Sequence, residues 1–183
     1  MVDAWQNCTK ADGATSVEGM YAVGDACSAG YELTPVAIAA GRLLADRLFG
    51  GLSEADSTMD YEMIPPVVFS PPPLAVMGLT EAQAKDAGKA VKVGRFPFIG
   101  NGKAIALGDA EGFIKTIFDA KSGELLGAHM IGAEVTELIQ GFSVAKTLET
   151  TESDLMHTVF PHPTLSEMMH ESVLDAYSRA IHH

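Results

Sequence analysis

The chain has 183 residues, of which 47% are hydrophobic and 20% charged, and its formal net charge at pH 7 is −12. This composition fits a soluble chain of one domain, or of one domain and part of another, while the negative charge argues against nucleic acid and anionic membrane surfaces as partners, because both attract Lys and Arg. No run approaches the roughly 20 apolar residues of a membrane span, and Cys8 and Cys27 form no redox or zinc motif, which indicates a reducing, cytoplasmic setting.

The first predicted unit is a short strand over residues 20–25 that ends in a Gly-Asp pair. Thr34 and Pro35 then predict the N-cap and the first residue of a helix over 34–48, which stops at Gly50 and Gly51. A strand, a loop with an aspartate and a helix N-terminus together form a plausible site for an anionic or polar part of a cofactor. An ordinary βα unit without a ligand explains the same pattern.

After a polar, acidic linker over 51–64, the pattern predicts a second unit. Its predicted strands cover 67–69, 74–77, 91–93, 96–98, 113–118 and 125–131, and its predicted helices begin at Thr80, Val135 and Thr164. The run 100–103, Gly-Asn-Gly-Lys, is interpreted as a turn. This order predicts an α+β domain with an antiparallel sheet and helices on one face.

The most informative motif is a histidine between two prolines. Pro161 and Pro163 place His162 on a stiff, extended backbone. Thr164 to Glu167 reads T-x-x-E, which is a capping box at the start of a helix. An imidazole held beside a carboxylate suits general acid–base chemistry. The alternative is that Glu167 only caps the helix and that His162 is structural.

The run 162–167, His-Pro-Thr-Leu-Ser-Glu, resembles the C-terminal signature of the FAD-dependent pyridine nucleotide–disulfide oxidoreductases. Its Leu-Ser version is most similar to the dihydrolipoyl dehydrogenases of that family. The resemblance implies that His162 is the acid–base catalyst of dithiol–disulfide exchange and that Glu167 orients it. It also implies a cis His-Pro peptide, and a homodimer in which the histidine serves the flavin site of the partner subunit.

Two earlier runs carry the same resemblance. Residues 17–25 resemble the second flavin motif, which implies that Gly24 and Asp25 bind FAD and that Asp25 holds its ribityl chain. Residues 32–37 are more similar to the glutathione reductases, where the helix start, here Thr34, faces the pyrimidine end of the flavin. The resemblance thus divides the chain into residues 1–60, the C-terminal segment of an FAD-binding α/β domain, and residues 61–183, an interface (dimerisation) domain.

The function implied by the resemblance belongs to a longer protein. That parent would oxidise dihydrolipoyl groups with NAD, through a redox disulfide and FAD, in a complex with a lipoyl-bearing acyltransferase. GxGxxG, CxxxxC and an NAD domain are absent here, so we expect a C-terminal fragment that is inactive alone and binds no cofactor tightly. The alternatives are a fragment of a glutathione-reductase-like enzyme that uses NADPH, and a non-catalytic dimerisation module.

Several further expectations concern the neighbourhood of the signature. Phe160 stands where many dihydrolipoyl dehydrogenases have a second histidine. The nearby histidines and Glu171 lack the spacing of a metal site, so no metal is expected. Met168 and Met169 are expected to lie on a helix partly exposed in a monomer, which favours burial in a homodimer. His182 is interpreted as part of a tag remnant and excluded from function.

Overall fold

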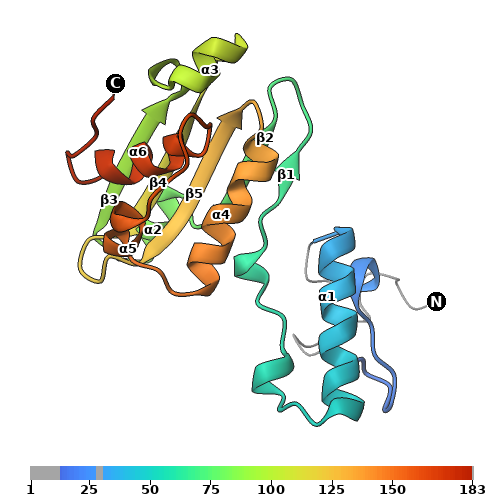
Figure 1. Ribbon diagram of the computed structural model, residues 1–183. Coiled ribbons are helices and arrows are strands. Elements are labelled where there is room, and N and C mark those ends of the chain that lie inside the picture. Colours follow the sequence, from blue (N-terminus) through green and yellow to red (C-terminus); the bar gives the residue numbers. More distant parts are fainter. Residues whose placement is uncertain (1–12, 28–30, 183) are drawn as a thin grey trace. The chain divides into compact units, whose positions relative to one another are not determined.

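The computed structural model describes residues 13–27 and 31–182, and the chain divides into two compact units, Met1–Tyr61 and Glu62–His183 (Figure 1). The first unit is built around α1 (Thr34–Ala45), which continues as a π-helix over Asp46–Gly50. Gly51 ends this helix with a left-handed φ of 80°. The glycine stop was therefore predicted correctly.

Two details of the first unit differ from the prediction. Residues 20–25 form no regular strand, because Tyr21 makes only an isolated bridge to Ala14 and the chain then turns into a 3-10 helix at Gly24–Ala26. The N-cap of α1 is Leu33 rather than Thr34, which is the first helical residue. Pro35 still occupies the first turn, where its missing N–H costs nothing.

Two observations bear on the predicted reducing, cytoplasmic setting. Cys27 is disulfide-bonded, and disulfides are typical of oxidising compartments. The cysteines therefore give no support to a reducing setting. In the part of the chain that the structure describes, no helix is long and apolar enough to cross a membrane.

The second unit contains a five-stranded antiparallel sheet in the order β1-β2-β5-β4-β3. The strands are β1 (Val67–Val68), β2 (Leu74–Gly78), β3 (Val91–Pro97), β4 (Gly112–Asp119) and β5 (Leu125–Gly132). The predicted hairpin is confirmed as β4–β5. Its turn is closed by the carboxylate of Asp119, which accepts hydrogen bonds from the N–H groups of Lys121 and Ser122.

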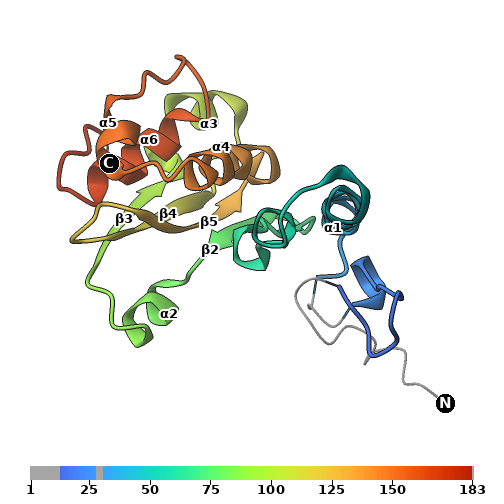
Figure 2. The same ribbon diagram turned by 90° about the horizontal axis from the view of Figure 1, so that it is seen from below.

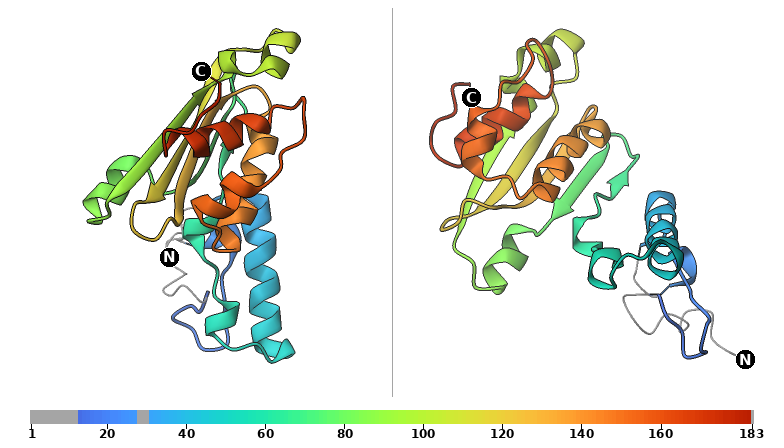
Figure 3. Two further views of the ribbon diagram at one scale, coloured as in Figure 1. Left: turned by 60° about the vertical axis from the view of Figure 1, so that its left-hand side comes forward. Right: turned by 60° about the horizontal axis from the view of Figure 1, so that its bottom comes forward.

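Among the described residues of this unit there are five α-helices, and the two longest cover one face of the sheet. They are α2 (Glu81–Asp86), α3 (Gly102–Leu107), α4 (Val135–Thr147), α5 (Glu152–His157) and α6 (Glu167–Asp175). Helix α6 packs over β3 and β4, and α4 over β5 and β2 (Figure 3). The α+β prediction is thus confirmed. The short α2 lies on the opposite face (Figure 2), where Ala84 packs with Ile117 and Leu126.

Two of the short helices were not predicted. The run 100–103 is not a plain turn: a 3-10 turn at Phe98–Gly100 leads into α3, and Asn101 caps α3 by accepting a hydrogen bond of 2.9 Å from the Ala104 N–H. Helix α5 begins with a capping box between Thr151 and Asp154. A capping signal can therefore be present in a short, polar run without a clear apolar period.

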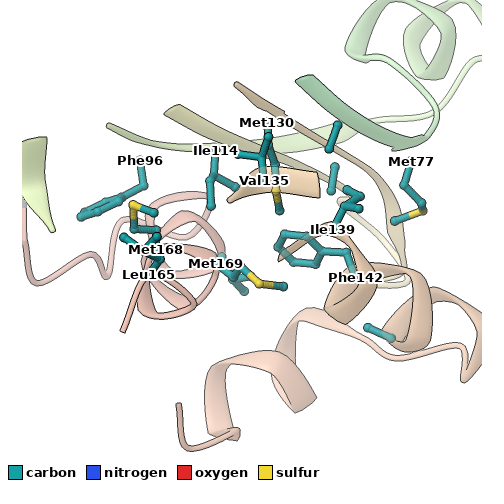
Figure 4. Packing of buried hydrophobic residues seen from close by; sticks show 14 of the residues in the cluster. Met77, Phe96, Ile114, Met130, Val135, Ile139, Phe142, Leu165, Met168 and Met169 are labelled. Atoms are coloured by element: carbon teal, nitrogen blue, oxygen red, sulfur yellow. The ribbon is translucent and has the colours of Figure 1, made fainter. Parts of the chain in front are cut away.

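The core between α4, α6 and the sheet includes the two methionines that were expected to be exposed (Figure 4). Met168 is fully buried, and Met169 is 5% exposed and reaches Gly141 of α4. The expectation that they mark an exposed dimer surface is wrong. The helical period turns both side chains toward the sheet and α4, so their burial is satisfied within one chain.

Helix α6 lies unusually close to β3 because of a glycine. A Cβ on Gly94 would overlap the carbonyl oxygen of Ser172 and approach the N of Ala176. The same carbonyl accepts a hydrogen bond of 3.0 Å from Thr116 Oγ1 on β4. These contacts fix α6 on the sheet, and with it Glu167 at its first position.

Candidate active site

The segment that leads into α6 carries His162 and contains a cis His162–Pro163 peptide, as the resemblance implied. The predicted capping box is only half formed. The Thr164 N–H donates to Glu167 Oε2 at 2.9 Å, as a capping box requires. The Thr164 hydroxyl, however, donates to the Pro161 carbonyl at 2.6 Å. The N-cap residue of α6 is Ser166, and its side chain makes no cap hydrogen bond. The Thr164 hydroxyl therefore closes the loop instead of capping the helix.

The structure brings His162 and Glu167 together. His162 Nδ1 lies 2.9 Å from Glu167 Oε1. Burial raises the pKa of Glu167, but the hydrogen bonds from the Thr164 N–H and from His162 outweigh it, and the pKa lies below its ordinary value. An ionised carboxylate only accepts, so the proton of the neutral imidazole must be on Nδ1. Nε2 is then the atom that can take up or release a proton.

This pair lies in an open groove of about 720 Å³. The groove is lined among others by Asn101, Lys103, Phe160, His162, Glu167 and His170. Phe160 stacks on the ring of His170 at 5.1 Å between centroids. Among the described residues no group of three or more His, Cys, Asp or Glu is arranged to hold a metal ion.

Helix α6 also supplies the carboxylate of a second imidazole–carboxylate pair. His182 Nδ1 is 2.8 Å from Glu171 Oε1, and the Ile181 N–H donates to Glu171 Oε2 at 2.9 Å. The sequence interpretation of His182 as a tag residue without a role missed this contact. Only the fold could reveal it, because the turn after α6 returns the chain to its own helix.

The predicted flavin-binding residues belong to the first unit. Gly24 has a φ of 64°, and a Cβ there would lie 2.8 Å from the Cβ of Ala37 on α1. Asp25 is exposed, as is Thr34 at the N-terminus of α1, which has no side-chain cap bond at Leu33. An exposed carboxylate beside an uncapped helix start fits the polar, hydroxyl-bearing edge of a flavin nucleotide.

Comparison with known families supports the resemblance. Residues 64–173 match the family model described as "Pyridine nucleotide-disulphide oxidoreductase, dimerisation domain". The chain belongs to this family.

Among curated relatives, the chain is 52% identical over 170 residues to the dihydrolipoyl dehydrogenase of Zymomonas mobilis. The matched region covers 93% of the chain and 36% of that protein. It is 40% identical over 168 residues to that of Bacillus subtilis, covering 92% of the chain and 35% of the relative. The chain therefore spans about a third of the length of the curated relatives it matches.

Solved structures agree on the fold. LpdA from Mycobacterium tuberculosis superposes with a TM-score of 0.82 at 24% identity, over 91% of this chain and 36% of that one. The HOCl-induced flavoprotein disulfide reductase RclA from Escherichia coli gives a TM-score of 0.79 at 26% identity, over 90% of this chain and 37% of that one. These likenesses fit an antiparallel, helix-covered interface domain.

Proposed function

We propose that the chain is the C-terminal part of a dihydrolipoyl dehydrogenase, with residues 1–60 as the end of the FAD-binding domain and 61–183 as the interface domain. The observation that carries the proposal is the His162–Glu167 pair, with 2.9 Å between Nδ1 and Oε1, in a chain 52% identical to a relative of that name. In this proposal His162 is the acid–base catalyst and Glu167 orients it.

The geometry suits proton removal from a thiol. His162 Nε2 would take the proton of one thiol of a dihydrolipoyl group, and the resulting thiolate would attack a redox disulfide elsewhere in the whole protein, breaking its S–S bond and forming a mixed disulfide. The second thiol of the dihydrolipoyl group would then displace the mixed disulfide, which closes the lipoyl disulfide and leaves the redox pair as two thiols. Glu167 stabilises the imidazolium formed in this step, because its negative charge lies against Nδ1–H. When bound, FAD would supply the acceptor for the electron pair of the two redox thiols, with NAD as the final acceptor.

The residues that would hold FAD in this proposal are Gly24, Asp25 and Thr34. They supply one edge of the site, whereas the pyrophosphate is held by a GxGxxG loop that these 183 residues lack. The chain by itself is therefore proposed to be inactive and to bind neither FAD nor NAD tightly. A yellow purified chain with near-stoichiometric flavin would contradict this.

The partners follow from the same proposal. The chain forms a homodimer, in which His162 serves the flavin site of the other subunit, and the whole protein works on a lipoyl-bearing acyltransferase complex in the cytoplasm. Light scattering on the chain at tens of micromolar tests the dimer, since a stable interface has a Kd well below that concentration. A monomer at this concentration would argue against self-association through residues 61–183.

The second candidate is a glutathione-reductase-like enzyme that uses NADPH, favoured by the Thr34-Pro35 helix start. The deciding experiment uses a protein of the relatives' length that carries this sequence, called here the whole enzyme. We expect it to reduce NAD with dihydrolipoamide and to be inactive with NADPH and glutathione disulfide. The reverse result would favour the second candidate, and activity with neither pair would favour a non-catalytic dimerisation module.

A further inference from the structure

The side chain of Asn101 connects α3 to the loop that carries His162. Asn101 is only 6% exposed. Its Oδ1 accepts a hydrogen bond from the Ala104 N–H at 2.9 Å, and its Nδ2–H donates to the Thr164 carbonyl at 3.1 Å, across 63 residues of sequence. One amide group therefore bonds two separate segments of backbone.

Capping alone does not require an amide. Ser, Thr and Asp cap a helix N-terminus about as well as Asn, because only an acceptor oxygen is needed. The Nδ2–H donor of Asn101 is additional to that role, and Thr164 is the residue that receives it. The amide group thus provides a bond to the loop that the other capping residues do not reproduce.

A series of hydrogen bonds connects Asn101 to the imidazole of His162. Thr164 accepts from Asn101 through its carbonyl and donates through its N–H to Glu167 Oε2 at 2.9 Å, while the other oxygen of Glu167 receives His162 Nδ1–H. The 3-10 turn before Asn101 is anchored in the core by Phe98, which is fully buried, as is Ala104. His162 itself is exposed, so packing contributes little to its placement.

We propose that Asn101 is a positioning residue for the His162–Glu167 pair. It fixes Thr164 against the core, and Thr164 in turn fixes the carboxylate that selects the Nδ1–H tautomer of His162. An effect of Asn101 on turnover rests on the proposed function. The placement of His162 and Glu167 by Asn101 is a property of the 183-residue chain and can be measured on that chain.

The test is Asn101→Asp, which keeps a capping oxygen but has no donor for the Thr164 carbonyl. By NMR, amide exchange at Thr164 should become faster, because the loop that holds its N–H against Glu167 Oε2 is fixed less firmly. The loss of one hydrogen bond sets an upper limit of roughly 10-fold. Exchange at Ala104 should stay within about 2-fold, because the cap remains. The imidazole ¹⁵N shifts of neutral His162 should move away from the pure Nδ1–H form, toward the values given by Glu167→Ala.

Two controls separate this effect from charge and from general loosening of α3. Gly102→Asp adds the same charge one residue away, into open space. Gly108→Ala places a side chain at a φ of 78° and strains the other end of α3. Both should leave Thr164 exchange and the His162 shifts unchanged.

Unchanged Thr164 exchange and His162 shifts in Asn101→Asp would overturn the proposal, and so would an equal change in either control. Failure of the proposed function is a different result: in the whole enzyme, His162→Gln would then keep full turnover, whatever the NMR of Asn101→Asp shows.

Discussion

Two of the carboxylates of helix α6, those of Glu167 and Glu171, lie four residues apart, and each is paired with a histidine along the same groove. Glu167 and His162 are 29% and 80% exposed, whereas Glu171 and His182 are 9% and 65% exposed. Glu171 also accepts from the backbone N–H groups of Ile181 and His182. The Glu171–His182 pair thus anchors the end of the chain to α6, whereas the Glu167–His162 pair presents an imidazole on a fixed backbone.

The largest expected effect concerns the first pair. In the whole enzyme, His162→Gln should lower kcat by roughly 10²- to 10⁴-fold, the range for a lost acid–base group, and Glu167→Gln by roughly 10-fold or more. Glutamine can still accept from the Thr164 N–H, so stability should hold within about 1 kcal/mol. The double variant should be little worse than His162→Gln, because residues that act as one unit are not additive.

The Glu171–His182 pair is expected to behave differently. His182→Gln should leave kcat of the whole enzyme within about 3-fold, since His182 has no part in the proposed proton transfer. A loss as large as that of His162→Gln would show that the two pairs do not differ in function. Unchanged turnover in Glu167→Gln would show that Glu167 is a helix residue without a catalytic task.

The next largest effect is expected where α6, which carries both carboxylates, packs against β3. Gly94→Ala forces α6 away from β3, because the new Cβ meets backbone atoms rather than a flexible side chain. We expect a loss of about 3 kcal/mol or more in unfolding free energy, at the upper end for overpacking. Denaturant unfolding of the chain measures it. Gly102→Ala is the control, because its Cβ would meet open space, and stability should not fall.

A smaller loss of stability is expected at the anchoring pair. Glu171→Ala removes the acceptor of Ile181 N–H and His182, and leaving such donors unpaired costs about 1–3 kcal/mol. The Tm of the chain should fall by several degrees, and Glu171→Gln, which keeps one acceptor oxygen, should lose less. A Tm equal to that of the wild type in Glu171→Ala would show that the last residues contribute no stability.

The smallest effect is a dependence of stability on pH. The folded state lowers the pKa of Glu167, so its contribution is complete above the unfolded value of about 4.3 and is lost as pH falls through the folded pKa. The Tm difference between wild type and Glu167→Gln should therefore be positive near pH 6 and should shrink toward zero as the pH falls through the lowered pKa of Glu167. The exposed Glu111→Gln is the control. A difference that grows on acidification would contradict the lowered pKa.

The elements with a clear local pattern were predictable. The hairpin β4–β5, helix α4 and the capping box of Thr80 with Gln83 follow from period and capping residues, which act over a few residues. The proximity of His162 and Glu167 was also predictable, because the two residues are only five positions apart and the two prolines stiffen the backbone around His162.

Long-range placement decided the rest. The sequence did not show that the sheet and α4 bury Met168 and Met169 within one chain, that Asn101 reaches Thr164, or that Glu171 binds the end of the chain. Each depends on which segments meet after the sheet and α6 have packed, and such contacts carry no local period. Only the tertiary structure therefore distinguished the open His162 pair from the anchoring pair on the same helix.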